Sequence, residues 1–220
     1  GTRSDPNFII KCFEIAAKYG VKTLNIADTV GYSTPLEMDA LVKKVLKNTK
    51  GIEKCNLSVH CHNDLGMGTS NTLQSIKAGA SQVECTINGI GERAGNAPLE
   101  EVVMALKTRK DFFNCKTQIN TKLLKECSTI VSKLTNLYIS KNKPIVGENV
   151  FAHESGIHQH GVLNKRETYE IMNPKDVGQK ETKINLGSQS GLKGVKFKLD
   201  YYKLNYKNLN LKEFVKFFKS

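Results

Sequence analysis

The first hundred residues alternate short apolar runs with longer segments whose apolar residues recur every three or four positions. A three-to-four spacing is typical of a helix with one buried face, whereas a short apolar run bounded by turn residues is typical of a buried strand. This pattern predicts helices that begin at Pro6, at Thr34-Pro35, after Asn63-Asp64 and at Pro98. It predicts strands at Val21–Ile26, Leu57–Cys61 and Gln82–Ile87.

The same spacing indicates which side chains face the core. For the four helices in turn, we expect these to be Phe8, Ile9, Cys12, Phe13 and Ala16; Leu36, Leu41, Val42 and Val45; Leu73, Ile76 and Ala80; and Leu99, Val102, Val103 and Leu106. Pro6 suits a first helical turn, where the missing N–H has no partner to lose, and Gly20 suits a left-handed helix end.

Strand–helix units that repeat at this interval indicate parallel strands joined by crossover helices. A doubly wound sheet and part of a (β/α)8 barrel both fit three such strands. In either fold, the functional side chains gather at the carboxyl ends of the strands.

The second half of the chain has a different pattern. A helix is expected at residues 121–136, with Leu123, Leu124, Cys127, Ile130, Val131 and Leu134 facing inward. A turn-rich segment, a histidine-rich stretch and a lysine-rich end follow it. We therefore expect two parts: an α/β catalytic part at residues 1–114 and a mainly helical accessory subdomain at residues 115–220.

Composition excludes some classes of protein. No apolar run approaches the roughly 18 residues of a membrane span. The net charge of +12 is consistent with a nucleic-acid-binding protein, but the lysines are spread along the whole chain and alternate with apolar residues. A solvated surface explains them at least as well, and we expect neither a nucleic-acid nor a membrane partner. The six cysteines form no CxxC pair, which favours free thiols in a reducing compartment.

The five histidines occupy only two short windows. His60 and His62 flank Cys61 at the end of a predicted strand. Because strand side chains alternate, both histidines should point to one face and Cys61 to the helix-covered face. Two imidazoles at this place form half of a divalent-metal site, although a pair of buried structural histidines remains the alternative.

Three further segments carry candidate chemistry. The glycine-rich turn at 88–97 contains Glu92, a candidate acid–base group, and Asn96, whose side-chain oxygen suits a hard metal ion. Asp28 and Thr29 follow a predicted strand. Their polar side chains suit either the binding of a substrate carboxylate or the capping of the next helix. Residues 147–161 are compatible with a helix and concentrate His and Glu, which favours either a general base or a structural hydrogen-bond network.

Four stretches together resemble the 2-isopropylmalate synthase family of the DRE-TIM metallolyase superfamily. They are LNIADTVGYSTP, LSVHCHNDLGMG, QVECTINGIGERAGNAPLEEVVMALKTR and GENVFAHESGIHQHGVLNKRETYEIMNPKDVG. The resemblance implies that the three strands are the last three of a (β/α)8 barrel. It implies an acyltransferase that condenses acetyl-CoA with a 2-oxo acid, 2-oxoisovalerate in leucine biosynthesis.

The resemblance also implies residue roles. His60, His62 and Asn96 would bind the metal ion (Zn²⁺, Mg²⁺ or Mn²⁺), and Thr29 would contact the carboxylate of the 2-oxo acid. His158 would be catalytic with Glu92 as its partner. The family's histidine comes from a neighbouring subunit, so a homodimer with exchanged accessory subdomains is implied.

The sequence departs from the family pattern in three ways. The first strands of the barrel, with the Arg-Asp motif that supplies a third metal-binding side chain, are absent from these 220 residues. His160 stands where the family usually has Asp, and the chain stops near where a leucine-binding regulatory domain would begin. A homocitrate or citramalate synthase and an inactive fragment therefore stay open as alternatives. The expected location is the cytoplasm or, alternatively, a plastid-type organelle.

Overall fold

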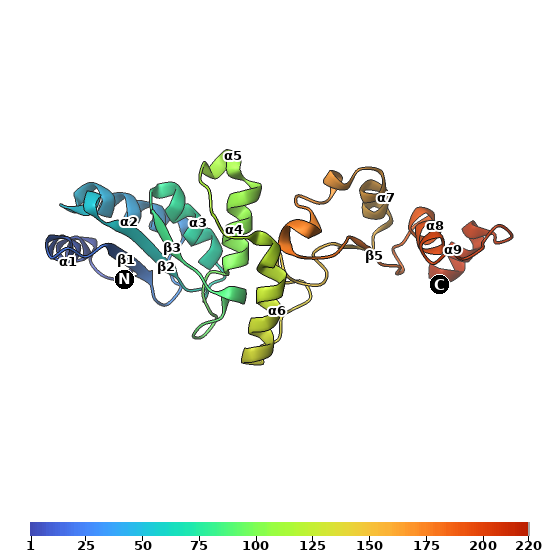
Figure 1. The fold of residues 1–220 in the computed structure, drawn as a ribbon, viewed down its shortest axis with the longest axis horizontal. Helices are drawn as coiled ribbons and strands as arrows, with labels where there is room; N and C mark the ends of the chain where they lie inside the picture. Colours follow the sequence, from blue (N-terminus) through green and yellow to red (C-terminus); the bar gives the residue numbers. More distant parts are fainter. Residues whose placement is uncertain (220) are drawn as a thin grey trace. The chain divides into compact units, whose positions relative to one another are not determined.

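The computed structural model describes residues 1–219. Its elements fall into two compact units, and each is described by itself (Figure 1). The first unit comprises Gly1–Ile119 with Ile130–Thr135, and the second comprises Asn120–Thr129 and the chain from Asn136 onward.

The first unit is built on a parallel three-stranded sheet in the order β1-β2-β3. The strands are β1 (Thr23–Asp28), β2 (Asn56–Cys61) and β3 (Gln82–Glu84). The helices that follow or precede them are α1 (Pro6–Lys18), α2 (Pro35–Asn48), α3 (Gly68–Ala78), α4 (Leu99–Thr108) and α5 (Lys110–Phe113). Short 3₁₀ turns occupy Ile52–Lys54 and Ile87–Gly89. The predicted parallel strand–helix order is confirmed.

The helix starts follow from local chemistry. Asp5 and Thr34 each accept a hydrogen bond from a backbone N–H of the first turn, and Pro6 and Pro35 are the first residues of α1 and α2. Thr34 and Glu37 form a reciprocal capping box, which satisfies two N–H groups that a helix start leaves unpaired. Gly20 follows α1 with φ of +82°, as expected for a left-handed helix end.

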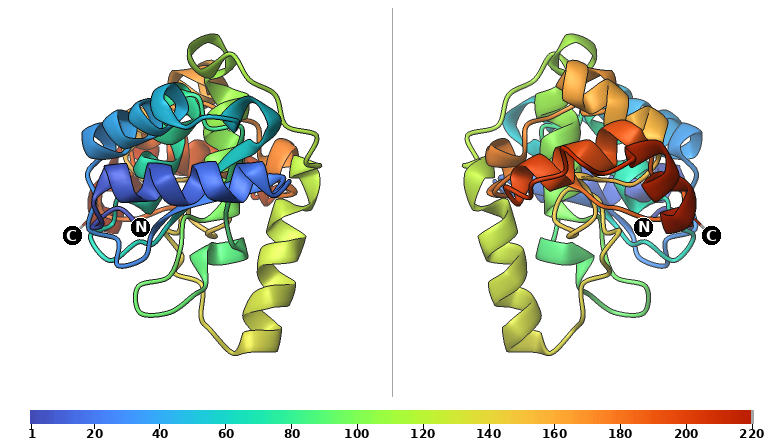
Figure 2. Two further views of the ribbon diagram at one scale, coloured as in Figure 1. Left: turned by 90° about the vertical axis from the view of Figure 1, so that its left-hand side faces the viewer. Right: turned by 90° about the vertical axis from the view of Figure 1, so that its right-hand side faces the viewer.

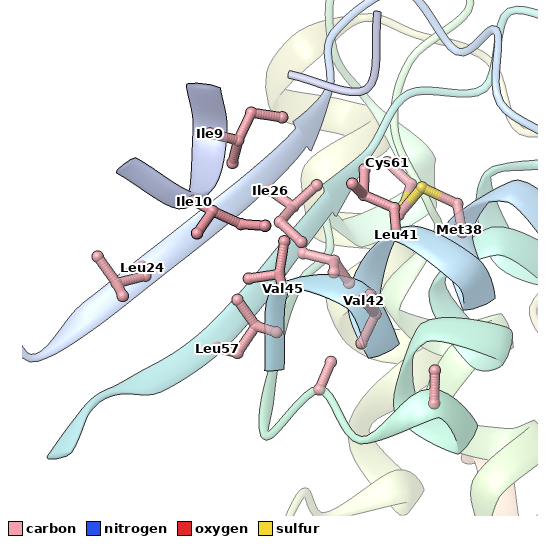
Figure 3. Close-up of a cluster of buried hydrophobic side chains, with 13 residues drawn as sticks. Ile9, Ile10, Leu24, Ile26, Met38, Leu41, Val42, Val45, Leu57 and Cys61 are labelled. Carbon is pink, nitrogen blue, oxygen red and sulfur yellow. The ribbon is translucent and has the colours of Figure 1, made fainter. Parts of the chain in front are cut away.

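The main hydrophobic core lies between the sheet and the helices α1 and α2. Every second residue of β1 and β2 points into it: Leu24 and Ile26 from β1, and Leu57, Val59 and Cys61 from β2. Figure 3 shows Leu24, Ile26, Leu57 and Cys61 among the side chains of Ile9 and Ile10 of α1 and Met38, Leu41, Val42 and Val45 of α2. The left view of Figure 2 shows α1 and α2 next to one another over the sheet.

Several predicted core positions are wrong. Phe8 and Leu36 are 62% and 79% exposed, because Ile10 and Met38 occupy the buried face of their helices instead. Cys12, also predicted to face the core, is exposed. In α3, the fully buried residues are Asn71, Thr72 and Ser75, whereas Leu73 and Ile76 are only half-buried. Small polar residues can be buried there because their side chains bond backbone carbonyls, as Asn71 does with Ser33 at 2.7 Å.

Two strand boundaries also differ from the prediction. The first strand begins at Thr23, two residues later than expected, and the third ends at Glu84 because the chain turns toward the 3₁₀ segment at Ile87.

The inward face predicted for the helix at 121–136 is also partly wrong. In that segment Leu123, Ile130 and Leu134 are exposed, and Leu124 is the apolar residue that is buried.

The second unit is mostly short helices around a two-stranded parallel sheet, β4 (Ala152–His153) and β5 (Lys183–Ile184). The longer helices assigned wholly to it are α7 (Gly156–Asn164), α8 (Leu192–Tyr201) and α9 (Leu211–Lys219). The right view of Figure 2 shows α8 and α9 next to one another. Helix α6 (Leu124–Thr135) contributes residues to both units, and 3₁₀ turns lie at Thr121–Leu123, Arg166–Thr168 and Pro174–Val177. Residue 220, the last of the predicted accessory subdomain, lies outside the described residues.

Candidate metal centre

The face of the sheet opposite the helices carries polar side chains in register. Asn25, Ser58 and Gln82 lie side by side on the three strands, and Ala27, His60 and Glu84 form the next row. The Gln82 side-chain amide donates to the Ser58 hydroxyl at 3.3 Å. The second row lies at the carboxyl ends of the strands, where parallel α/β folds place their chemistry.

His60 and His62 converge at this end of β2. Their Nε2 atoms are 3.2 Å apart and the two rings are nearly perpendicular, at 79°. Cys61 between them is completely buried in the helix-covered core, and burial raises the pKa of its thiol to about 12. The alternation that the sequence predicts therefore holds at this strand end.

Each histidine has a charged side chain beside its other ring nitrogen. His60 Nδ1 lies 3.1 Å from a carboxylate oxygen of Glu84 on β3. His62 Nδ1 lies 3.1 Å from Nη2 of Arg93, in the glycine-rich turn. Burial, followed by the charges of His60 and Arg93, lowers the pKa of His62, which favours the neutral imidazole that metals bind.

Arg93 connects three strand-end loops and is a residue that the sequence interpretation missed. It donates to both carboxylate oxygens of Asp64, at 2.8 and 3.2 Å, and to the backbone carbonyl of Thr29. The Arg93 hydrogen bonds hold the pKa of the Asp64 carboxyl below its usual range. Arg93 has φ of +55°, a backbone conformation that sequence spacing does not reveal for a non-glycine residue.

Asn96 closes the turn against β2. It forms an isolated antiparallel bridge with His62, and its side-chain Nδ2 donates to the Ile90 carbonyl at 3.0 Å. Its Oδ1 is buried and has no hydrogen-bond partner among the described residues. Gly95 makes the tight turn possible, because a Cβ there would lie 1.9 Å from the Gly89 carbonyl oxygen.

These donors fit a divalent cation. With metal–nitrogen bonds of about 2.1 Å, nitrogens 3.2 Å apart subtend an angle of about 100° at the metal, between the octahedral and tetrahedral values. A buried amide oxygen without a partner is a suitable third ligand. Across residues 1–219, no set of three or more His, Cys, Asp or Glu side chains is placed to hold a metal. The candidate centre is therefore two imidazoles and an amide.

The other candidate residues that the sequence predicts in this unit have different contacts and different exposure. Asp28 is buried and accepts hydrogen bonds from Thr2, Tyr32 and Ser33, so its carboxylate fixes the loop after β1. Thr29 is exposed. The Glu92 side chain is 85% exposed and lies 3.6 Å from Nη1 of Arg93.

The histidine-rich window belongs to the second unit. His158 lies on α7, is exposed, and contacts the ring of Tyr169, with centroids 4.2 Å apart and ring planes tilted by 36°. His153 on β4 is buried against the carboxylate of Glu170, which also accepts from Thr182 and pairs with Arg166. Sequence spacing alone could not show that His158 is exposed and His153 is structural. The histidine-rich segment contains strand β4 at Ala152–His153 and becomes helical only at Gly156.

Comparison with known proteins identifies the family. Residues 1–131 match the sequence profile described as HMGL-like. The chain belongs to the HMGL-like family. Residues 145–220 of this HMGL-like chain match a second profile, described as homocitrate synthase post-HMGL domain-like.

Curated relatives share about half of the residues. The chain is 51% identical over 218 residues to a 2-isopropylmalate synthase of Clostridium kluyveri, covering 99% of this chain and 42% of that protein. It is 54% identical over 200 residues to the Aquifex aeolicus 2-isopropylmalate synthase, covering 90% of this chain and 38% of that protein. The chain thus spans about two fifths of the length of the curated relatives that it matches. The predicted resemblance is confirmed.

Solved structures support the fold. An HMG-CoA lyase of Bacillus subtilis aligns with a TM-score of 0.53 at 18% identity, over 60% of this chain and 44% of that one. The carboxyl transferase domain of Rhizobium etli pyruvate carboxylase aligns with a TM-score of 0.51 at 16% identity, over 61% and 21%. The fold class predicted from the sequence, part of a TIM-type barrel with a helical addition, is confirmed. No helix within residues 1–219 is long and apolar enough to cross a membrane.

Proposed function

We propose that this chain carries the metal-binding end of a 2-isopropylmalate synthase, an acyltransferase that condenses acetyl-CoA with 2-oxoisovalerate in leucine biosynthesis. The observation that carries the proposal is the convergence of His60 and His62 at the carboxyl end of β2. Asn96, whose backbone bridges to that of His62, adds a buried side-chain oxygen without a hydrogen-bond partner among the described residues. The identity of about 50% to curated 2-isopropylmalate synthases supports it.

The three ligands have distinct tasks. His60, His62 and Asn96 are the residues that would hold a divalent cation. When bound, Zn²⁺, Mg²⁺ or Mn²⁺ would act as a Lewis acid that polarises the carbonyl of the 2-oxo acid. The carboxylate of Glu84 lies 3.1 Å from the other ring nitrogen of His60, the side from which carboxylates orient metal-bound histidines in many proteins.

Substrate binding and proton transfer fall to other residues. Thr29, at the end of β1, contacts the carboxylate of the 2-oxo acid with its hydroxyl. His158 is the base that takes a proton from the acetyl methyl group, and Glu92 is its partner. Because the family's histidine comes from a neighbouring subunit, His158 of the partner subunit would pair with Glu92 in a homodimer with exchanged accessory subdomains.

We assign residues 1–114 to the catalytic barrel and residues 115–220 to the accessory subdomain. The relatives are bacterial and archaeal, as in Clostridium kluyveri and Pyrococcus furiosus, which supports a cytoplasmic enzyme over a plastid-type location.

A second candidate is a homocitrate synthase, since the profile that matches residues 145–220 carries that name. The two enzymes differ in the 2-oxo acid that they accept. Release of CoA from acetyl-CoA by the metal-loaded protein that carries this chain distinguishes them, with 2-oxoisovalerate, 2-oxoglutarate and pyruvate compared. We expect at least tenfold faster release with 2-oxoisovalerate, on the order of the discrimination that a well-fitted apolar pocket provides. A preference for 2-oxoglutarate, or no release with any of them, would contradict the proposal.

A further inference from the structure

Four side chains at the carboxyl ends of β2 and β3 form one continuous row. Nη2 of Arg93 lies 3.1 Å from Nδ1 of His62, and Nε2 of His62 lies 3.2 Å from Nε2 of His60. Nδ1 of His60 then lies 3.1 Å from the carboxylate of Glu84. All four residues belong to the first unit.

The Arg93 end of this row fixes the ring protons of both histidines. A guanidinium only donates, so Nδ1 of His62 must accept, and the single ring proton of neutral His62 lies on Nε2. That proton is directed at Nε2 of His60, 3.2 Å away, so Nε2 of His60 accepts it and the single ring proton of neutral His60 lies on Nδ1. The short distance between the two Nε2 atoms is thereby explained as a hydrogen bond from His62 to His60.

This arrangement opposes metal binding at His62. A metal ion needs the lone pair of Nε2, which in this row is protonated and directed at His60. To free it, the ring proton of His62 must move through solvent from Nε2 to Nδ1, with no net release of a proton. A proton on Nδ1 would face the Arg93 guanidinium, so Arg93 must then leave His62.

We propose that Arg93 controls metal entry by holding His62 in the tautomer that cannot bind a metal, and that a divalent cation displaces Arg93 from His62. The inference rests on the proposed metal role of His60 and His62. Arg93 stays at the centre after displacement because the Asp64 carboxylate holds it from Nε and Nη2. Arg93 is therefore a positioning residue for His62.

NMR of the metal-free chain tests the tautomer directly. Spectra that correlate ring nitrogens with carbon-bound ring protons, recorded at about pH 8 where histidine is neutral, separate the two tautomers. We expect His62 as the Nε2-protonated form in the wild type and as a mixture or the Nδ1-protonated form in Arg93→Asn. Asn is chosen because it tolerates positive φ. Arg109→Asn is the matched control, since Arg109 forms a similar fork with Asp111 elsewhere. Nδ1-protonated His62 in the wild type would overturn the inference.

Zinc titration of the same three proteins tests the consequence. We expect Arg93→Asn to bind Zn²⁺ about five- to tenfold more tightly than the wild type, as loss of one competing hydrogen bond of about 1 kcal/mol predicts, and Arg109→Asn to bind as the wild type does. Equal affinity of Arg93→Asn and wild type would overturn the inference. A higher zinc affinity of Arg93→Asn that disappears at high salt would also overturn the inference, because it would show that Arg93 acts only through charge repulsion of the cation. Absence of zinc binding in every protein would refute the proposed function, while the tautomer measurement would still test Arg93.

Discussion

Gly31 lies where the loop after β1 passes the segment that follows His62. It has φ of +56°, and a Cβ at this position would lie 2.6 Å from the backbone nitrogen of Asp64. Asp64 in turn holds Arg93 beside His62. The absence of a side chain at one residue therefore sets the spacing of the loops around the candidate metal centre.

Gly31→Ala should destabilise the chain by about 3 kcal/mol, since it combines a backbone clash with left-handed strain. Gly20→Ala is the matched control: Gly20 also has positive φ, but nothing lies within 4 Å of its built Cβ. We expect that control to cost about 1 kcal/mol. Urea unfolding measures both, and equal losses would show that the close approach to Asp64 is unimportant.

The cysteines differ strongly in environment. Burial, followed by the charges of Glu100 and Glu84, raises the pKa of the Cys85 thiol to about 12, whereas Cys12 is exposed on α1. At about pH 8, roughly one Cys85 thiol in ten thousand is ionised, and the thiolate is the reactive form.

We therefore expect a disulfide reagent to label Cys12 rapidly and Cys85 much more slowly in the folded chain. Mass spectrometry of the labelled peptides measures this, with the chain in denaturant as the control that labels all six cysteines. Labelling of Cys85 in the folded chain at the rate of Cys12 would contradict its raised pKa.

The orientation of His60 and His62 could be predicted from the sequence because it depends on strand alternation alone. The contacts of Arg93 could not. These contacts join Arg93, a turn residue with positive φ, to residues 29, 62 and 64. No local sequence pattern predicts that loops so far apart in the chain come into contact.

At the level of elements, α2 shows both the strength and the limit of sequence patterns. Its start at Thr34-Pro35 was predictable from capping chemistry, and Leu41, Val42 and Val45 are buried as expected. Leu36 is exposed because Met38 takes the buried position. Apolar residues on more than one side of a helix leave the buried face undetermined until its neighbours are known.

Leu41→Ala and Leu36→Ala make the same chemical change on the same helix. We expect Leu41→Ala to cost about 2–4 kcal/mol, because it leaves a cavity between α2 and the sheet, and Leu36→Ala to cost less than about 1 kcal/mol. Chemical denaturation of both variants measures the difference. A larger loss for Leu36→Ala would mean that α2 is rotated relative to the sheet described above.

At the scale of the whole molecule, the three-stranded sheet has edges at β1 and β3 that are not paired with a further strand among the described residues. Edges of this kind pair readily with other chains. The net charge of +12 opposes association at low ionic strength and is screened as salt is added.

We therefore expect the chain to self-associate in a concentration-dependent way, more strongly at about 0.5 M salt than at low salt. Sedimentation velocity over a range of concentrations measures this. A monomer at every concentration and salt level would contradict both the exposed edges and the proposed homodimer.

The central claim is that His60 and His62 form the core of a divalent-metal site, and calorimetric titration with Zn²⁺ tests it most directly. Three proteins suffice: the wild type, His60→Ala/His62→Ala, and His160→Ala as a control that removes an exposed histidine of the second unit. The predicted result is binding on the order of micromolar by the wild type and the control, and its loss in the double variant. No binding by the folded wild type, or unchanged binding by the double variant, would contradict the claim.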